Sequence, residues 1–75
     1  MAQTLTADND NDPILISIKE AAKLTSMSRP LINILRIEGD FPRAVQLSER
    51  RIAFVRTEVM DWIKRHVAAR TEVVA

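Results

Sequence analysis

The stretch that most constrains the fold is residues 17–39, which carries the signals for two short helices joined by a tight turn. Ser17 and Glu20 have the spacing of a capping box, in which a hydroxyl and a carboxylate satisfy backbone N–H groups at the start of a helix. Ser28 is suited to cap a second helix, and Gly39 can adopt the left-handed conformation that ends one. The chain is therefore expected to form a helix, a turn and a second helix here.

The second helix has two possible starts. If Ser28 is the N-cap, Pro30 falls in the first turn, where its missing N–H has no partner to lose. A residue before proline avoids helical dihedral angles, which makes Arg29 the alternative cap and Pro30 the first helical residue. The sequence leaves both starts open.

At 100° per residue, the second helix has one face for a core and one face for solvent. Ile32 and Leu35 point toward the expected core. The opposite face suits the bases of DNA, because arginine can bind guanine and asparagine can bind adenine, each through two hydrogen bonds. The side chains expected to face bases are those of Arg29, Pro30, Asn33 and Ile37. This pattern indicates a helix-turn-helix that reads DNA, and an ordinary helical hairpin with a solvated face is the alternative.

Two short alternating segments follow at residues 44–47 and 51–54, with a polar loop at residues 48–50 between them. Apolar and polar side chains that alternate on both sides of a polar loop predict a β-hairpin. Arg50 and Arg51 then lie at its tip, where a wing would press them on phosphates or into the adjacent minor groove. The residues expected to bind phosphates are Ser28, Arg36, Arg50 and Arg51.

The last segment predicts a third helix. Thr57 is expected to cap it, with Glu58 and Asp61 in the first turn, where the helix dipole favours negative charge. An apolar stripe with helical spacing is expected to pack under the hairpin and the first two helices. Its members are Val59, Trp62, Ile63, His66 and Val67. The expected fold class is thus mainly α with a small β-hairpin, a winged helix-turn-helix.

The composition argues against several kinds of site. The 75-residue chain has no cysteine, one histidine and one glycine, so a disulfide, a thiolate metal site and a glycine-rich phosphate loop are not expected. His66 is interpreted as a packing residue at the edge of the core. We expect no enzyme activity, metal, cofactor, small-molecule substrate or membrane contact, and we expect a cytoplasmic protein.

Charge is unevenly distributed along the chain. Residues 1–13 contain three aspartates and no basic residue, and are expected to form a disordered acidic tail. All 11 Lys and Arg residues and seven of the ten acidic residues come later. Residues 14–70 are expected to form the DNA-binding domain and residues 71–75 a flexible C-terminus. The modest basic excess suits DNA, although a solvated mixed surface would show the same balance.

Several short motifs occur together between Ile16 and Arg65. They are SIKEAA at residues 17–22, MSR at 27–29, GDFP at 39–42, RRIAF at 50–54 and TEVMDWI at 57–63. In this combination the chain resembles the AlpA family of small phage and mobile-element regulators, within the MerR-like winged helix-turn-helix group. Pro30, Asn33 and Phe54 stand where that family usually has serine or threonine, tyrosine and tryptophan. The first two changes lie on the expected DNA-facing surface and so bear on the target sequence.

The resemblance implies a DNA-binding regulator of transcription in a prophage or mobile element, or an excisionase that acts with an integrase. The partners it implies are double-stranded DNA and an integrase, and the location it implies is the bacterial nucleoid. Because one such domain reads only a few base pairs, we also expect self-association on DNA. The alternative from another class is a protein-interaction module. In that reading Leu31, Ile34 and Ile37 bind an integrase or a repressor.

Overall fold

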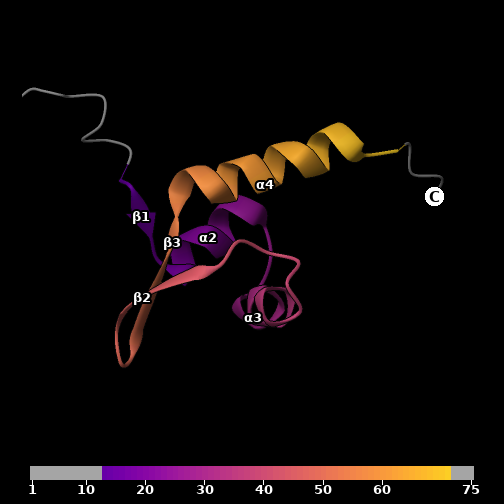
Figure 1. The fold of residues 1–75 in the computed structure, drawn as a ribbon. Helices are drawn as coiled ribbons and strands as arrows, with labels where there is room; N and C mark the ends of the chain where they lie inside the picture. The colour runs from indigo at the N-terminus through magenta and orange to yellow at the C-terminus, as the bar shows by residue number, and fades with distance from the viewer. Residues whose placement is uncertain (1–12, 72–75) are drawn as a thin grey trace, which may run out of the picture.

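The structure, a computed structural model, describes residues 13–71, which contain three helices and a three-stranded antiparallel sheet (Figure 1). In chain order the elements are β1 (Leu15–Ile16), α2 (Ile18–Thr25), α3 (Arg29–Ile37), β2 (Ala44–Ser48), β3 (Arg51–Val55) and α4 (Arg56–Ala69). This arrangement confirms the predicted mainly α fold with a hairpin wing. The predicted acidic tail and flexible C-terminus lie almost entirely outside the described residues, and the bounds of the DNA-binding domain stay a prediction.

The sheet has one more strand than the sequence indicated. The lead-in before α2 forms β1, which pairs with β3 so that the strand order is β1-β3-β2. Ile16 lies opposite Phe54, and the backbone N–H of Arg56 donates to the carbonyl of Ile14 at 2.8 Å. β1 thereby covers the edge of β3 that would otherwise leave backbone groups unpaired.

The hairpin itself is tighter than expected. Ser48 pairs with Arg51, so only Glu49 and Arg50 form the turn, and the predicted three-residue loop is one residue too long. The register shifts between Gln46 and Ser48, where the Gln46 side chain donates to the Ser48 carbonyl at 3.2 Å. Such a bulge bends and twists a strand, and it lies close to the tip of the wing.

Side-chain caps fix the starts of α2 and α3. The Ser17 hydroxyl accepts a hydrogen bond from the Glu20 N–H at 3.1 Å, and the Ser28 hydroxyl accepts one from the Leu31 N–H at 3.2 Å. Ser28 is therefore the N-cap, and Arg29 is the first residue of α3. Between the helices, Ser26 adopts a left-handed conformation with φ of 61°, which turns the chain sharply.

Gly39 ends α3 as predicted. Its φ is 84°, and its N–H donates to the Arg36 carbonyl at 3.2 Å. The next N–H, that of Asp40, donates to the Leu35 carbonyl at 2.8 Å, which completes a Schellman motif. No atom lies within 4 Å of the position that a Cβ would take at Gly39, so the backbone conformation rather than space requires glycine.

The predicted start of α4 is wrong by two residues, since the expected cap was Thr57. The helix begins at Arg56, and its cap position is Val55, which makes no side-chain cap hydrogen bond. Thr57 therefore lies inside the helix, and Asp61 falls beyond its first turn. The physical reason is that β3 runs directly into α4, so the first helical N–H is satisfied by β1, through the Ile14 carbonyl, instead of by a hydroxyl.

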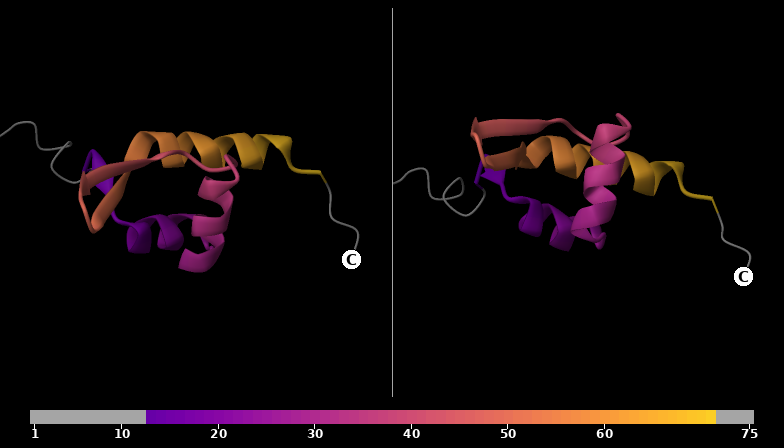
Figure 2. Two further views of the ribbon diagram at one scale, coloured as in Figure 1. Left: turned by 60° about the horizontal axis from the view of Figure 1, so that its bottom comes forward. Right: turned by 90° about the horizontal axis from the view of Figure 1, so that it is seen from below.

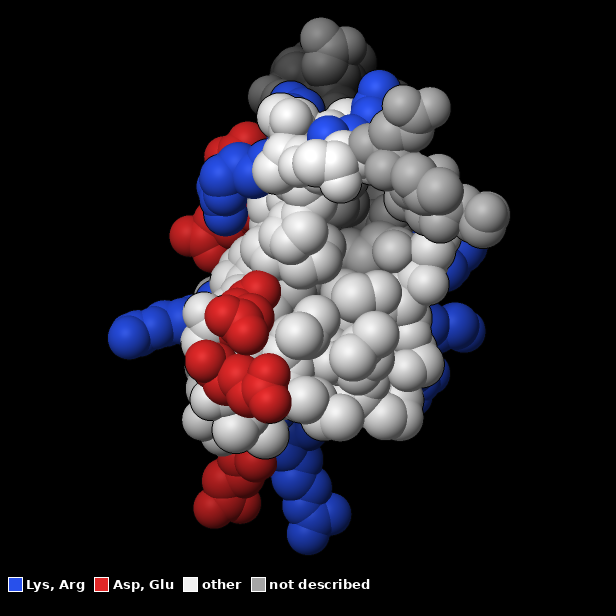
Figure 3. Space-filling model, turned by 90° about the vertical axis from the view of Figure 1, so that its right-hand side faces the viewer, with Lys and Arg blue, Asp and Glu red and all other residues white. Residues whose placement is uncertain are grey.

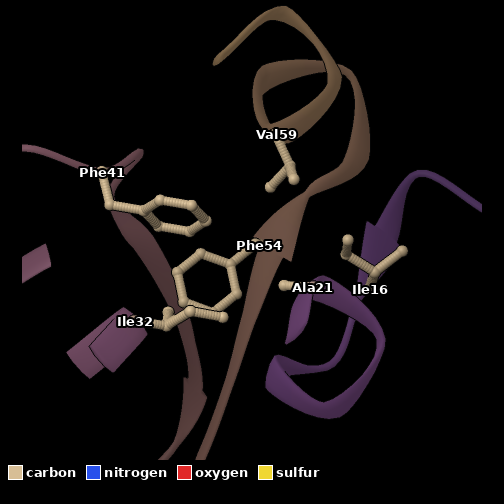
Figure 4. Packing of buried hydrophobic residues seen from close by; sticks show 6 residues of the cluster. All are labelled: Ile16, Ala21, Ile32, Phe41, Phe54 and Val59. Carbon is tan, nitrogen blue, oxygen red and sulfur yellow. The ribbon is translucent and has the colours of Figure 1, made fainter. Parts of the chain in front are cut away.

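The core lies between the sheet and the three helices (Figure 4). Phe41 contacts both Phe54 and Trp62 edge to face, with ring centroids 5.4 Å and 5.0 Å apart. The Trp62 indole N–H donates to the Asp40 carbonyl at 2.8 Å, which fastens α4 to the loop after α3. The buried cluster consists of Ile16, Ala21, Ile32, Phe41, Phe54 and Val59.

The predicted apolar stripe of α4 is right for three of its five residues. Val59 is buried and Trp62 and Ile63 are partly buried, but His66 and Val67 are exposed. The last turns of α4 extend past the core (Figure 1). His66 stacks against Trp62, with ring centroids 3.9 Å apart, so it packs on the surface and not in the core edge as expected.

Candidate nucleic-acid interface

α3 and the tip of the hairpin occupy one side of the molecule. Figure 1 shows both at the lower edge, with α4 along the upper edge. From below, α3 crosses the direction of α4 and the hairpin extends to one side of it (Figure 2). The second helix of the pair and the turn of the wing are therefore both open to a partner on this side.

Burial confirms the predicted inner face of α3. Ile32 is fully buried and Leu35 is partly buried against the core cluster. On the predicted outer face, Arg29 and Pro30 are exposed and Ile37 is 76% exposed.

Asn33, the fourth residue expected to face bases, is partly buried, and its side chain accepts a hydrogen bond. The Arg36 Nε–H donates to the Asn33 Oδ1 at 2.9 Å. This bond orients the carboxamide and leaves its NH₂ group and the second lone pair of Oδ1 available. Sequence reasoning assigned Arg36 to phosphate alone and missed this contact, although the i, i+3 spacing of the two residues would have indicated it.

The solvent side of α3 has two flanks of different character. Helical geometry places Arg29, Asn33 and Arg36 on one flank. It places Leu31 and Ile34, which are 40% and 51% exposed, on the other flank. Pro30 and Ile37 lie along the outermost line between them. The face to the right in Figure 1 is mostly uncharged at its centre; it carries Asp and Glu down its left-hand side and Lys and Arg at its margins (Figure 3).

The start of α3 and the wing tip provide the groups expected to bind phosphate. Ser28 accepts one backbone hydrogen bond, and its hydroxyl proton remains free to donate. No acidic residue lies in the first turn of α3, so the positive end of the helix dipole is not neutralised there. Arg50 lies in the turn and Arg51 begins β3, and both side chains are exposed.

Within residues 13–71 no cluster of three or more histidine, aspartate or glutamate side chains is arranged to hold a metal ion. In the same range no helix has the length and apolar character needed to cross a membrane.

A helix-turn-helix followed by a hairpin, with basic side chains on the second helix and on the hairpin tip, defines a protein of the winged helix-turn-helix class. The chain belongs to the AlpA family, since residues 15–67 match the family described as prophage CP4-57 regulatory protein (AlpA). The resemblance noted in the sequence is thereby confirmed, and the chain is a regulatory protein of the phage type. The matched range contains every residue predicted to contact DNA. A search among curated proteins gives no match.

Proposed function

We propose that this protein is a sequence-specific double-stranded DNA-binding regulator of a prophage or mobile element. α3 enters the major groove, and the β2–β3 hairpin rests on phosphates or in the adjacent minor groove. The observation that carries the proposal is the placement of Arg29 and Asn33 on the exposed side of α3, on the same side of the molecule as the hairpin tip with its two arginines.

Base reading falls to the outer face of α3. Arg29 has the geometry to bind guanine O6 and N7, and Asn33 can bind adenine N6 and N7. The bond from Arg36 to Asn33 supports this role, because a carboxamide held in one orientation loses less entropy on binding. Pro30 and Ile37 add apolar contact along the same line.

Phosphate binding falls to the residues around that face. Arg36 uses its Nε–H on Asn33, and its terminal NH₂ groups remain for a phosphate. The hairpin arginines are exposed at the tip, where small displacements are tolerated because phosphates repeat along each strand. The residues assigned to phosphates are Ser28, Arg36, Arg50 and Arg51.

One domain with a nine-residue reading helix contacts only a few base pairs. Adjacent copies would read more base pairs and strengthen one another's binding, so we infer that several copies associate on DNA. Such a regulator acts at the nucleoid, in the bacterial cytoplasm.

The test is selection of bound fragments from the source genome, followed by footprinting at moderate salt. Protection over a promoter supports a transcriptional regulator. Protection of repeated sites beside an attachment sequence supports the other candidate of the same class, an excisionase that acts with an integrase. No enrichment over random DNA contradicts both.

Exposed apolar side chains on α3 support a function of another class, binding to a partner protein. Leu31, Ile34 and Ile37 are large apolar side chains exposed on one short helix, as a protein-interaction module that binds an integrase or a repressor would require. Association with such a partner that is insensitive to salt, with no retardation of any duplex, would favour this function over DNA binding.

A further inference from the structure

We propose that Ile37 reads the methyl group of a thymine, so that the target contains a thymine at a fixed position near the base pair bound by Asn33. This inference rests on the proposed function, because it requires α3 to lie in the major groove. Ile37 has no side-chain hydrogen-bonding group, so it would recognise this base through apolar contact alone.

The exposure of Ile37 is the first observation. At 76% exposed it is the most open of the large apolar side chains on α3. A single exposed apolar residue is ordinary. Ile37, however, lies on the outermost line of the helix, four positions after Asn33 and therefore on the same face.

The dimensions of α3 are the second observation. Its nine residues span roughly 13 Å, which along the groove is the length of about four base-pair steps, so residues at either end of α3 can meet base edges. Asn33 and Ile37 are separated by roughly 6 Å along the helix axis. Base pairs are about 3.4 Å apart, so the two side chains would meet base pairs one or two steps apart.

The chemistry of the groove selects thymine. Its C5-methyl is the apolar group that natural base pairs present in the major groove, and cytosine has only a hydrogen there. Isoleucine suits this partner because its branched side chain has one strongly preferred rotamer in a helix and loses little freedom on contact.

The test compares thymine with deoxyuridine, which keeps the base pairing and removes only the methyl group. Each thymine of the footprinted site is replaced singly, and the dissociation constant is measured at fixed salt. The proteins are the unmodified chain, Ile37→Ala and Ile14→Ala. Ile14 is a matched control, because it is the same residue type with 78% exposure and lies outside α3.

We expect one position at which deoxyuridine weakens binding of the unmodified chain by about fourfold, the equivalent of about 0.8 kcal/mol for one buried methyl group. Ile37→Ala should bind the thymine and deoxyuridine versions of that site equally. Ile14→Ala should keep the fourfold difference. Circular dichroism of both variants checks that they fold, as expected for exposed side chains.

Two outcomes would overturn the inference while leaving the proposed function intact. In the first, the chain binds its site but tolerates deoxyuridine everywhere. In the second, the penalty persists in Ile37→Ala, so that another group contacts the methyl. Loss of self-association or of integrase binding in Ile37→Ala, with no deoxyuridine effect, would place Ile37 in a protein interface. If no duplex is bound specifically, the proposed function itself fails.

Discussion

α3 and the β2–β3 hairpin face the same side of the molecule, but they are held in different ways. α3 is fixed at both ends, by the Ser28 cap and by the Schellman motif at Gly39, and it is anchored in the middle by Ile32. The hairpin is anchored at its base, where Phe54 is buried and Ala44 and Ile52 pack against the core cluster. Its outer part is exposed from Gln46 to Arg51. Contacts with single bases require side chains at fixed positions, which suits α3 because it is held along its whole length. Phosphates repeat along each strand and tolerate small displacements, which suits a hairpin held at one end.

The largest effect is expected where the hairpin joins the core. Phe54 is fully buried against Phe41, so Phe54→Ala should lower the free energy of unfolding by about 3–5 kcal/mol, enough to unfold a domain of this size. Ile32→Val, a smaller change at the anchor of α3, should cost about 0.5–1.5 kcal/mol. Urea unfolding measures both. If Phe54→Ala lowered the free energy of unfolding no more than Ile32→Val does, the base of the hairpin would not be part of the core.

The next effect separates base reading from phosphate binding. Asn33→Ala should weaken binding to the cognate site by about 1–3 kcal/mol and change binding to unrelated duplexes little, because it removes hydrogen bonds to one base. Titration of both duplexes with the variant provides the measurement. An equal loss on every sequence would contradict base reading by this residue.

A smaller effect is expected at the start of α3. Ser28→Ala removes the side-chain cap and should lower the free energy of unfolding by about 1 kcal/mol. Ser48→Ala, at an exposed serine of the hairpin, is the matched control and should stay within about 0.5 kcal/mol of the unmodified chain. Thermal unfolding of the two variants measures whether the cap of α3 contributes more to stability than an exposed serine of the hairpin does.

The smallest effect is expected at the hairpin tip. Arg51→Ala should weaken binding to all duplexes alike and reduce the slope of log affinity against log salt by roughly 1, because one phosphate contact is lost. Lys64→Ala, at an exposed residue of α4, should leave the slope unchanged. Loss of discrimination between sequences in Arg51→Ala would instead assign that side chain to a base in the minor groove.

Local signals explain which parts of the fold the sequence predicted. Caps, the glycine stop and helical spacing act within a few residues, so α2, α3 and the inner face at Ile32 followed from the sequence. β1 was missed because its two residues are recognisable only through pairing with β3, far along the chain. The start of α4 was misplaced for the same reason, since the Ile14 carbonyl takes the role given to Thr57.

The candidate site was predicted in part. Which face of α3 is exposed followed from 100° periodicity, and the positions of Arg50 and Arg51 followed from the hairpin pattern. The contact between Arg36 and Asn33 was not predicted, because both residues were assigned to DNA without considering that they could bind each other. Burial of Val59 but not of Val67 depends on how far the core extends along α4, which periodicity does not specify.

The backbone hydrogen bond from the Arg56 N–H to the Ile14 carbonyl joins the two ends of a long segment. This segment, a ring closed by that bond, contains α2, α3 and the whole hairpin. Its ends are distant in sequence, so closing it costs loop entropy that the packing of the helices and the sheet must offset. The Arg56 amide proton should consequently exchange with solvent only when the ring opens. In hydrogen exchange, that single amide reports whether the two DNA-facing elements are still held together.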